Sequence, residues 1–127
     1  MSASPGYLLT ADEVDHYRAE GYLCLDRPLL APGDLAQVGR SLDRLFERFA
    51  SIPLGFAQDL DVGAAADGLP RIPEVNFTTV LAPSLSRSPV IRVCTQIARQ
   101  LHGRRAHLVF DHAIYKSPEN GAATSWH

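Results

Sequence analysis

Polar and apolar residues near the start of the chain alternate with the period of a helix, and the ends of this segment are well marked. Thr10 and Glu13 have the spacing of a capping box, in which each side chain accepts a hydrogen bond from the other residue's backbone N–H. Gly21 stands where a helix commonly ends on a left-handed residue. The pattern therefore predicts a helix over residues 11–20.

The same spacing predicts two later helices. Asp34 is the expected N-cap of the first, and Ser88 followed by Pro89 begins the second, which ends at Gly103. The apolar face of the first comprises Leu35, Val38, Leu42, Leu45, Phe46 and Phe49. The apolar face of the second comprises Val90, Ile91, Cys94, Ile97, Ala98 and Leu101.

Charged residues occupy the other side of the earlier helix, namely Arg40, Asp43, Arg44, Glu47 and Arg48. One interpretation is a charged docking surface. The other is a solvated helix face held by weak ion pairs, which is the ordinary use of such a pattern. The pattern favours the solvated face.

Strands are expected in the remaining apolar segments. Residues 22–25 and 74–81 are β-prone. Residues 106–116 are expected to form a strand, in which His112 would share one face with apolar residues. A turn and the start of a further strand are expected after residue 116. Residues 51–73 lack periodicity and are expected to form a long loop or lid.

These elements predict an α+β chain, organised as one domain over residues 1–127. The helical N-terminal region covers residues 1–50 and the loop or lid covers residues 51–73. A helix and the first core strands then occupy residues 74–127. The domain formed by these residues is expected to be incomplete.

Composition narrows the class of protein. The chain has 127 residues, of which 46% are hydrophobic, and a formal net charge of −2, which argues against disorder and against binding to nucleic acid. No apolar run approaches the roughly 20 residues that span a bilayer, and the first residues do not read as a secretory signal. Cys24 and Cys94 are expected to be buried free thiols, so a cytoplasmic protein is predicted.

The histidines give a weak metal signal. His102, His107 and His112 recur every five residues, which is not the helical spacing that places two imidazoles on one face. On a strand, His107 and His112 would point to opposite sides. There is no Gly-rich phosphate loop, no nucleophile elbow and no Cys-x-x-Cys pair.

The last part of the chain carries the most specific pattern, LHGRRAHLVFDHAIYKSPENGAATSWH. A helix ending in Leu-His-Gly is followed by a strand, then by Lys116-Ser117-Pro118 and Gly121, and then by Trp126-His127. This order resembles the phytanoyl-CoA dioxygenase family of iron- and 2-oxoglutarate-dependent oxygenases. The opening LTADEVDHYRAEGY and the segment PSLSRSPVIRVCTQIARQLHG also resemble that family, although Ser117 stands where its first proline is usual.

The resemblance implies a fold, cofactors and site residues. It implies a double-stranded β-helix of the jelly-roll or cupin-like type, with the N-terminal helices packed outside. It assigns His127 as the first ligand of Fe(II), and it places His112 and Arg71 against 2-oxoglutarate. Trp126 either lines the substrate pocket or packs in the barrel wall. The alternatives are a core histidine bonded to a backbone carbonyl for His112 and a solvated loop arginine for Arg71.

The resemblance also implies whether the 127 residues are active by themselves. A metal centre of this class needs two histidines and a carboxylate, and the sequence up to His127 supplies only the first of them. The 127 residues alone are therefore expected to be inactive, whereas the parent enzyme would oxidise a small organic molecule. The alternative is a non-catalytic relative or an interaction domain, completed by a partner chain or self-associating through open strand edges.

Overall fold

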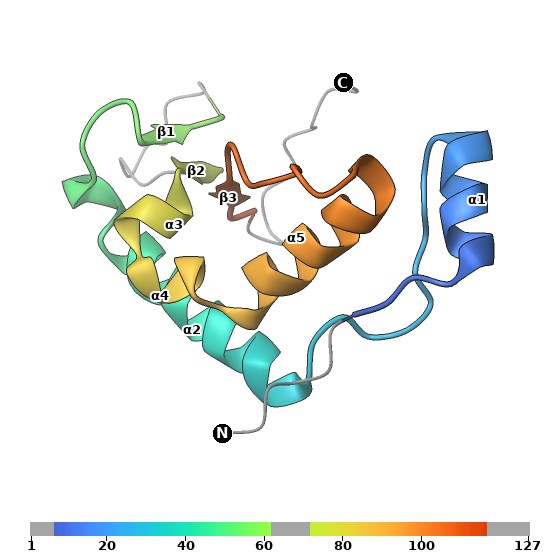
Figure 1. Ribbon diagram of the computed structural model, residues 1–127. Coiled ribbons are helices and arrows are strands. Elements are labelled where there is room, and N and C mark those ends of the chain that lie inside the picture. Colours follow the sequence, from blue (N-terminus) through green and yellow to red (C-terminus); the bar gives the residue numbers. More distant parts are fainter. Residues whose placement is uncertain (1–6, 62–71, 117–127) are drawn as a thin grey trace.

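The computed structural model describes residues 7–61 and 72–116, and these residues form an α+β fold. Helices and strands follow in the order α1 (Ala11–Glu20), α2 (Pro32–Glu47), the 3₁₀ turn η1 (Phe49–Ser51), β1 (Ala57–Asp59), β2 (Pro73–Asn76), α3 (Thr78–Leu81), α4 (Pro83–Ser86), α5 (Pro89–His102) and β3 (His112–Ile114). Helices α2 and α4 lie below the sheet in Figure 1, α5 lies to the right of the sheet, and α1 stands apart at the far right. The α+β class expected from the sequence is thereby confirmed.

The predicted helices are present, with one difference in where they begin. The capping box of α1 is complete, because Thr10 Oγ1 accepts from the Glu13 N–H at 3.2 Å and Glu13 Oε2 accepts from the Thr10 N–H at 2.7 Å. Gly21 ends the helix in the left-handed region with φ 80°. Helix α2 begins earlier than expected, at Pro32, so Asp34 lies in its first turn and is not the N-cap.

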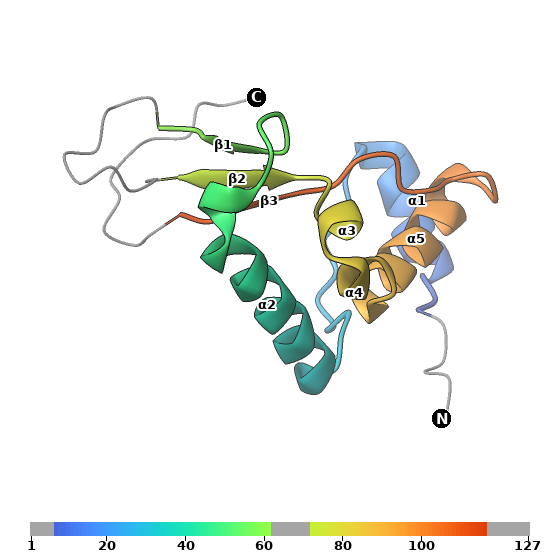
Figure 2. The same cartoon turned by 90° about the vertical axis from the view of Figure 1, so that its left-hand side faces the viewer.

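The strands form one antiparallel sheet in the order β1-β2-β3. Val75 is opposite Ala57 on one side and Ala113 on the other. Because alternate residues of a strand face the same way, Tyr115 shares the face of Ala113 and Val75. The Tyr115 ring lies 5.7 Å from that of Phe46 in α2, so this is the face on which α2 packs, as Figure 2 shows from the side.

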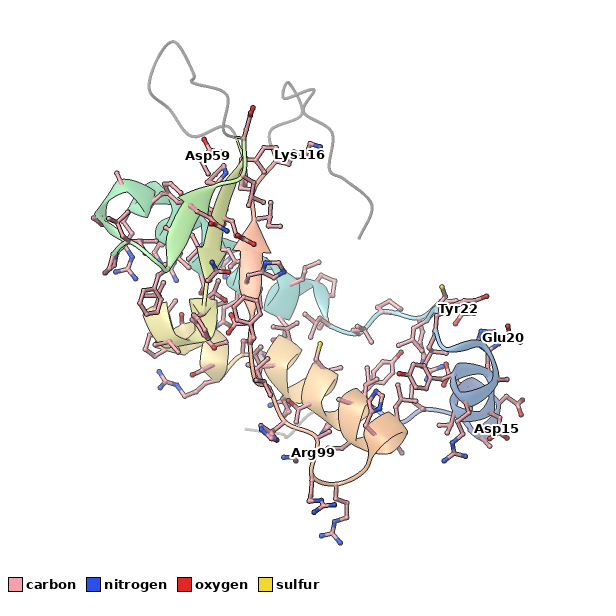
Figure 3. All side chains as sticks on the ribbon, turned by 90° about the horizontal axis from the view of Figure 1, so that it is seen from above. Asp15, Glu20, Tyr22, Asp59, Arg99 and Lys116 are labelled. Carbon is pink, nitrogen blue, oxygen red and sulfur yellow. The ribbon has the colours of Figure 1, made fainter. Side chains whose placement is uncertain are left out.

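The core is centred on the contact between this sheet and the helices. Val75 is completely buried and Leu45 of α2 is 1% exposed. The other buried apolar residues in the described part of the chain are Ile72, Leu85 and Val93. In Figure 3 the sheet, marked by Asp59 and Lys116, lies at the opposite side of the molecule from α1 and the residues that follow it, marked by Asp15, Glu20 and Tyr22.

Several strand predictions are wrong. Residues 22–25 form a connection with no strand partner among the described residues. The strand expected over residues 74–81 stops at Asn76, because Phe77 adopts the left-handed region with φ 56° and the chain then turns into α3. Only residues 112–114 of the expected strand 106–116 pair in the sheet.

Two further expectations also need correction. Strand β1 lies inside the segment predicted as a continuous loop, where it pairs with β2. Cys24 and Cys94 are free thiols as expected, but both are exposed. In α5 the buried position is Val93, which the predicted apolar face did not include. Within the two described ranges, no helix combines the length and the hydropathy that crossing a membrane requires.

Candidate functional site

The sheet face opposite α2 carries a polar cluster built from all three strands. Gln58 of β1 is directly opposite Glu74 of β2, and Asn76 of β2 is opposite His112 of β3. Since Glu74 and Asn76 are two residues apart, these four side chains share a face. We call Gln58, Glu74 and His112 the sheet cluster.

Hydrogen bonds join the sheet cluster into a row. The Gln58 amide donates to Oε2 of Glu74, and Nδ1 of His112 lies 2.6 Å from Oε1 of the same carboxylate. The second contact is a diagonal one, because His112 pairs in register with Asn76 and reaches across to Glu74. One carboxylate therefore connects the two outer strands of the described sheet through side chains.

Glu74 is charged despite its burial. The residue is 7% exposed, and burial alone would raise its pKa. The hydrogen bond from Gln58, followed by the hydrogen bond and the charge of His112, lowers the pKa of Glu74 below its usual 4.5. Glu74 is therefore a carboxylate at neutral pH.

The charge of Glu74 fixes the orientation of His112. A carboxylate can only accept hydrogen bonds, so Nδ1 of His112 carries the hydrogen and donates it. The His112 side chain is 47% exposed, which leaves Nε2 as the nitrogen available to a ligand. This is the arrangement by which a carboxylate sets the tautomer and the direction of a functional imidazole.

A second carboxylate holds the edge strand in place. Asp111 accepts hydrogen bonds from the hydroxyls of Thr78 and Thr79, and from the Thr79 N–H at 3.1 Å. Burial works against the charge of Asp111, but these hydrogen bonds outweigh it and lower its pKa. The Phe77 N–H also donates to the Asp111 carbonyl at 2.7 Å. These hydrogen bonds fix Asp111, the residue directly before His112, to the start of α3.

Aromatic side chains line one side of the sheet cluster. The rings of Phe56 and Phe77 are 5.8 Å apart, those of Phe77 and Phe110 are 5.0 Å apart, and Phe110 lies 5.5 Å from His112. Phe110 is 49% exposed. The imidazole is therefore bordered by a buried carboxylate and by an accessible apolar surface, a combination suited to a small organic ligand with a polar end.

Of the predicted site residues, only His112 lies in the described part of the chain. The partner of His112 is the carboxylate of Glu74 and its side chain is 47% exposed, so the alternative of a core histidine bonded to a backbone carbonyl is wrong in both respects. Arg71, Trp126 and His127 lie outside the described residues.

The other histidines do not join His112. Nε2 of His102 lies 3.1 Å from the Tyr17 hydroxyl, and Nδ1 of His107 lies 2.9 Å from the Arg105 carbonyl. Among the described residues, no group of three or more His, Cys, Asp or Glu side chains is placed to hold a metal ion.

Sequence reasoning missed Gln58 and Glu74. Gln58 lies in the segment without periodicity, and Glu74 stands at the start of a strand where an exposed position is the ordinary expectation. The only available signal was a charged residue within the β-prone segment 74–81. Comparison with known proteins adds no assignment, since no family model, curated protein or solved structure matches the chain.

Proposed function

We propose that the chain is the N-terminal part of an iron- and 2-oxoglutarate-dependent oxygenase that oxidises a small organic molecule. The observation that supports this proposal best is the sheet cluster, in which His112 is oriented by Glu74 on the sheet face opposite α2. In the family that the sequence resembles, the helices pack outside the barrel and the cofactor lies inside it. The described sheet has the same division between a helix-covered face and a polar face.

In this proposal each residue has a separate role. Nε2 of His112 contacts a carboxylate group of 2-oxoglutarate, and Glu74 acts as a positioning residue behind it. Arg71 provides a second contact to the cofactor, His127 binds iron, and Trp126 lines the substrate pocket. When bound, iron and 2-oxoglutarate reduce O₂, placing one oxygen atom in succinate, with release of CO₂, and the other in the hydroxylated substrate.

The described residues fit the 2-oxoglutarate part of this proposal. A carboxylate ligand needs hydrogen-bond donors in a partly enclosed position. With Nδ1 of His112 donating to Glu74, Nε2 donates to such a ligand when the imidazole carries both of its hydrogens. The iron part depends on His127 and on a further carboxylate and histidine that the 127 residues do not supply in the family's pattern. The jelly-roll barrel would likewise need strands beyond the three described.

The first experiment reads the gene on either side of this segment and assays its full product. We expect an aspartate two residues after His127, and succinate formation from 2-oxoglutarate that requires Fe(II). His112→Ala should raise the KM for 2-oxoglutarate about tenfold or more, because it removes a hydrogen bond to a charged group. His107→Ala is the matched control, since that imidazole is exposed and contacts the carbonyl of Arg105.

Two results would contradict the proposal. One is a gene product that completes no second and third iron ligand after His127. The other is succinate formation by the 127 residues alone, which would show that the iron ligands have been assigned wrongly. An unchanged KM in the His112→Ala enzyme would remove His112 from the site while leaving the oxygenase assignment intact.

A second candidate function is an interaction domain completed by a partner chain. It is favoured by the apolar residues ahead of β3, because Leu108, Val109 and Phe110 are 44%, 79% and 49% exposed. These residues precede a strand that lies at one edge of the described sheet. Absence of any 2-oxoglutarate binding by the full gene product, together with a stable complex with a second polypeptide, would select this function.

A further inference from the structure

A pocket of about 360 Å³ lies between α2 and the segment that contains α3 and α4. Its polar lining includes Ser41, Arg44 and Glu47 of α2, Arg48 at the C-cap of α2, and Ser84 of α4. Figure 2 shows α2 beside α3 and α4, below the sheet, and none of the residues that line the pocket belongs to the sheet cluster. The pocket is therefore separate from the sheet cluster.

Both arginines in the lining are held by groups of the pocket itself. The Arg44 guanidinium donates to the Ser41 hydroxyl at 3.2 Å, and the Arg48 guanidinium donates to the Leu81 carbonyl at 2.8 Å. Neither arginine forms an ion pair with a carboxylate of the described residues. A guanidinium has five N–H donors, so each arginine keeps most of its donors for a ligand.

The serines of the pocket add a surplus donor. Ser41 is 4% exposed, and its hydroxyl and that of Ser84 are 3.3 Å apart. Ser84 donates its hydroxyl hydrogen to Ser41, which also accepts from Arg44, and the Ser41 hydroxyl hydrogen has no acceptor among the described residues. A buried hydroxyl hydrogen without an acceptor is unfavourable, and an anionic oxygen in the pocket would satisfy it.

The balance of charge and donors indicates the ligand. Two guanidinium groups and a hydroxyl face the pocket, against the single carboxylate of Glu47 in its lining. Two guanidinium groups suit an anion with several oxygens, and phosphate offers more of these than a carboxylate. The volume also exceeds that of one phosphate group and lies in the range of small-molecule sites.

We propose that this pocket binds a phosphate group through Arg44, Arg48 and the Ser41–Ser84 pair. The phosphate is either inorganic phosphate or the phosphomonoester of a small molecule. This inference is independent of the oxygenase proposal, because it uses neither the sheet cluster nor any residue assigned to iron or 2-oxoglutarate.

The test is an NMR titration of the 127-residue chain with inorganic phosphate and, separately, with phenyl phosphate, at constant ionic strength. We expect saturable shifts of the backbone amides of Ser41, Arg44 and Ser84 with both ligands. The double substitution Arg44→Gln and Arg48→Gln should weaken binding by about tenfold or more. Arg40→Gln is the matched control, because Arg40 is an exposed arginine of α2 that does not line the pocket.

The two ligands distinguish the source of the phosphate. Tighter binding of phenyl phosphate supports a phosphomonoester, and equal binding supports inorganic phosphate. The proposal is overturned if the shifts do not saturate, if sodium acetate at the same ionic strength produces the same shifts, or if Arg40→Gln weakens binding as much as the double substitution. Because all three arginines are exposed, the variants should fold, and circular dichroism checks this point.

Discussion

Glu74 carries a negative charge in a position where burial opposes it, and its hydrogen bonds exist only in the folded chain. Its pKa is lower in the folded state than the ordinary 4.5, first because Gln58 donates to the carboxylate and then because His112 does. A carboxyl group with a lowered folded pKa stabilises the fold above its unfolded pKa, and this contribution disappears as the pH falls through the folded value. The sheet is therefore expected to weaken in acid.

The prediction is a fall in the free energy of unfolding as the pH decreases below 4.5, and a smaller fall in Glu74→Gln. The glutamine keeps the shape of the side chain but has no charge to lose. Urea unfolding followed by circular dichroism at a series of pH values measures both proteins. Asp43→Asn, at an exposed position of α2, should retain the acid sensitivity of the original chain. Equal pH profiles for Glu74→Gln and the original chain would contradict this account.

Asp111 has a structural role that a substitution can measure. Replacement by alanine removes the acceptor for Thr78, which is buried, and for the hydroxyl and N–H of Thr79. Leaving these donors without partners should destabilise the chain by about 1–3 kcal/mol in urea unfolding. Asp111→Asn keeps one acceptor oxygen and should have a smaller effect. A change in Asp111→Ala no larger than that of Asp43→Ala would show that the interaction with α3 does not matter for stability.

Helices could be predicted because their signals are local. Thr10, Glu13 and Gly21 lie within or beside the same few turns, and the structure confirms each of them as a cap of α1. Strands could not be placed as well, because pairing depends on distant residues. The turn at Phe77, for example, follows from contacts with Asp111, which is far away in the sequence. β-Prone residues such as Val80 therefore sit in α3 instead of a strand.

Replacing Gly21, which caps α1, and Gly39, inside α2, should change the free energy of unfolding in opposite directions. Gly21 has φ 80°, a conformation that alanine adopts at a cost of about 1–2 kcal/mol. Gly39 lies inside α2, and a Cβ added there would meet no atom within 4 Å. Gly21→Ala should therefore destabilise the chain by about 1 kcal/mol, whereas Gly39→Ala should stabilise it by about 0.5–1 kcal/mol. Thermal and urea unfolding measure both, and a change of the same sign in the two variants would contradict the assignment of these positions.

At the scale of the whole molecule, the sequence predicted one member of the sheet cluster and missed its partners. His112 was identified through alternation along one strand and the resemblance to a known family. Gln58 and Glu74 join it only after the register of β1, β2 and β3 is known, and register depends on the packing of the complete sheet. Sequence patterns report which residues could share a face of one strand, but not which residues of other strands stand beside them.

The exposed residues ahead of β3 lead to a prediction about association. Leu108, Val109 and Phe110 form a continuous apolar segment beside the sheet edge, and such segments favour contacts between chains. We expect the 127-residue chain to self-associate as its concentration rises. Val109→Lys should lower the association constant by about tenfold, because it places a charge where apolar surface would otherwise be buried. Leu54→Lys, at a residue that is 97% exposed and outside this segment, is the control. Sedimentation equilibrium measures all three chains, and equal constants for the two variants would show that association does not use this edge.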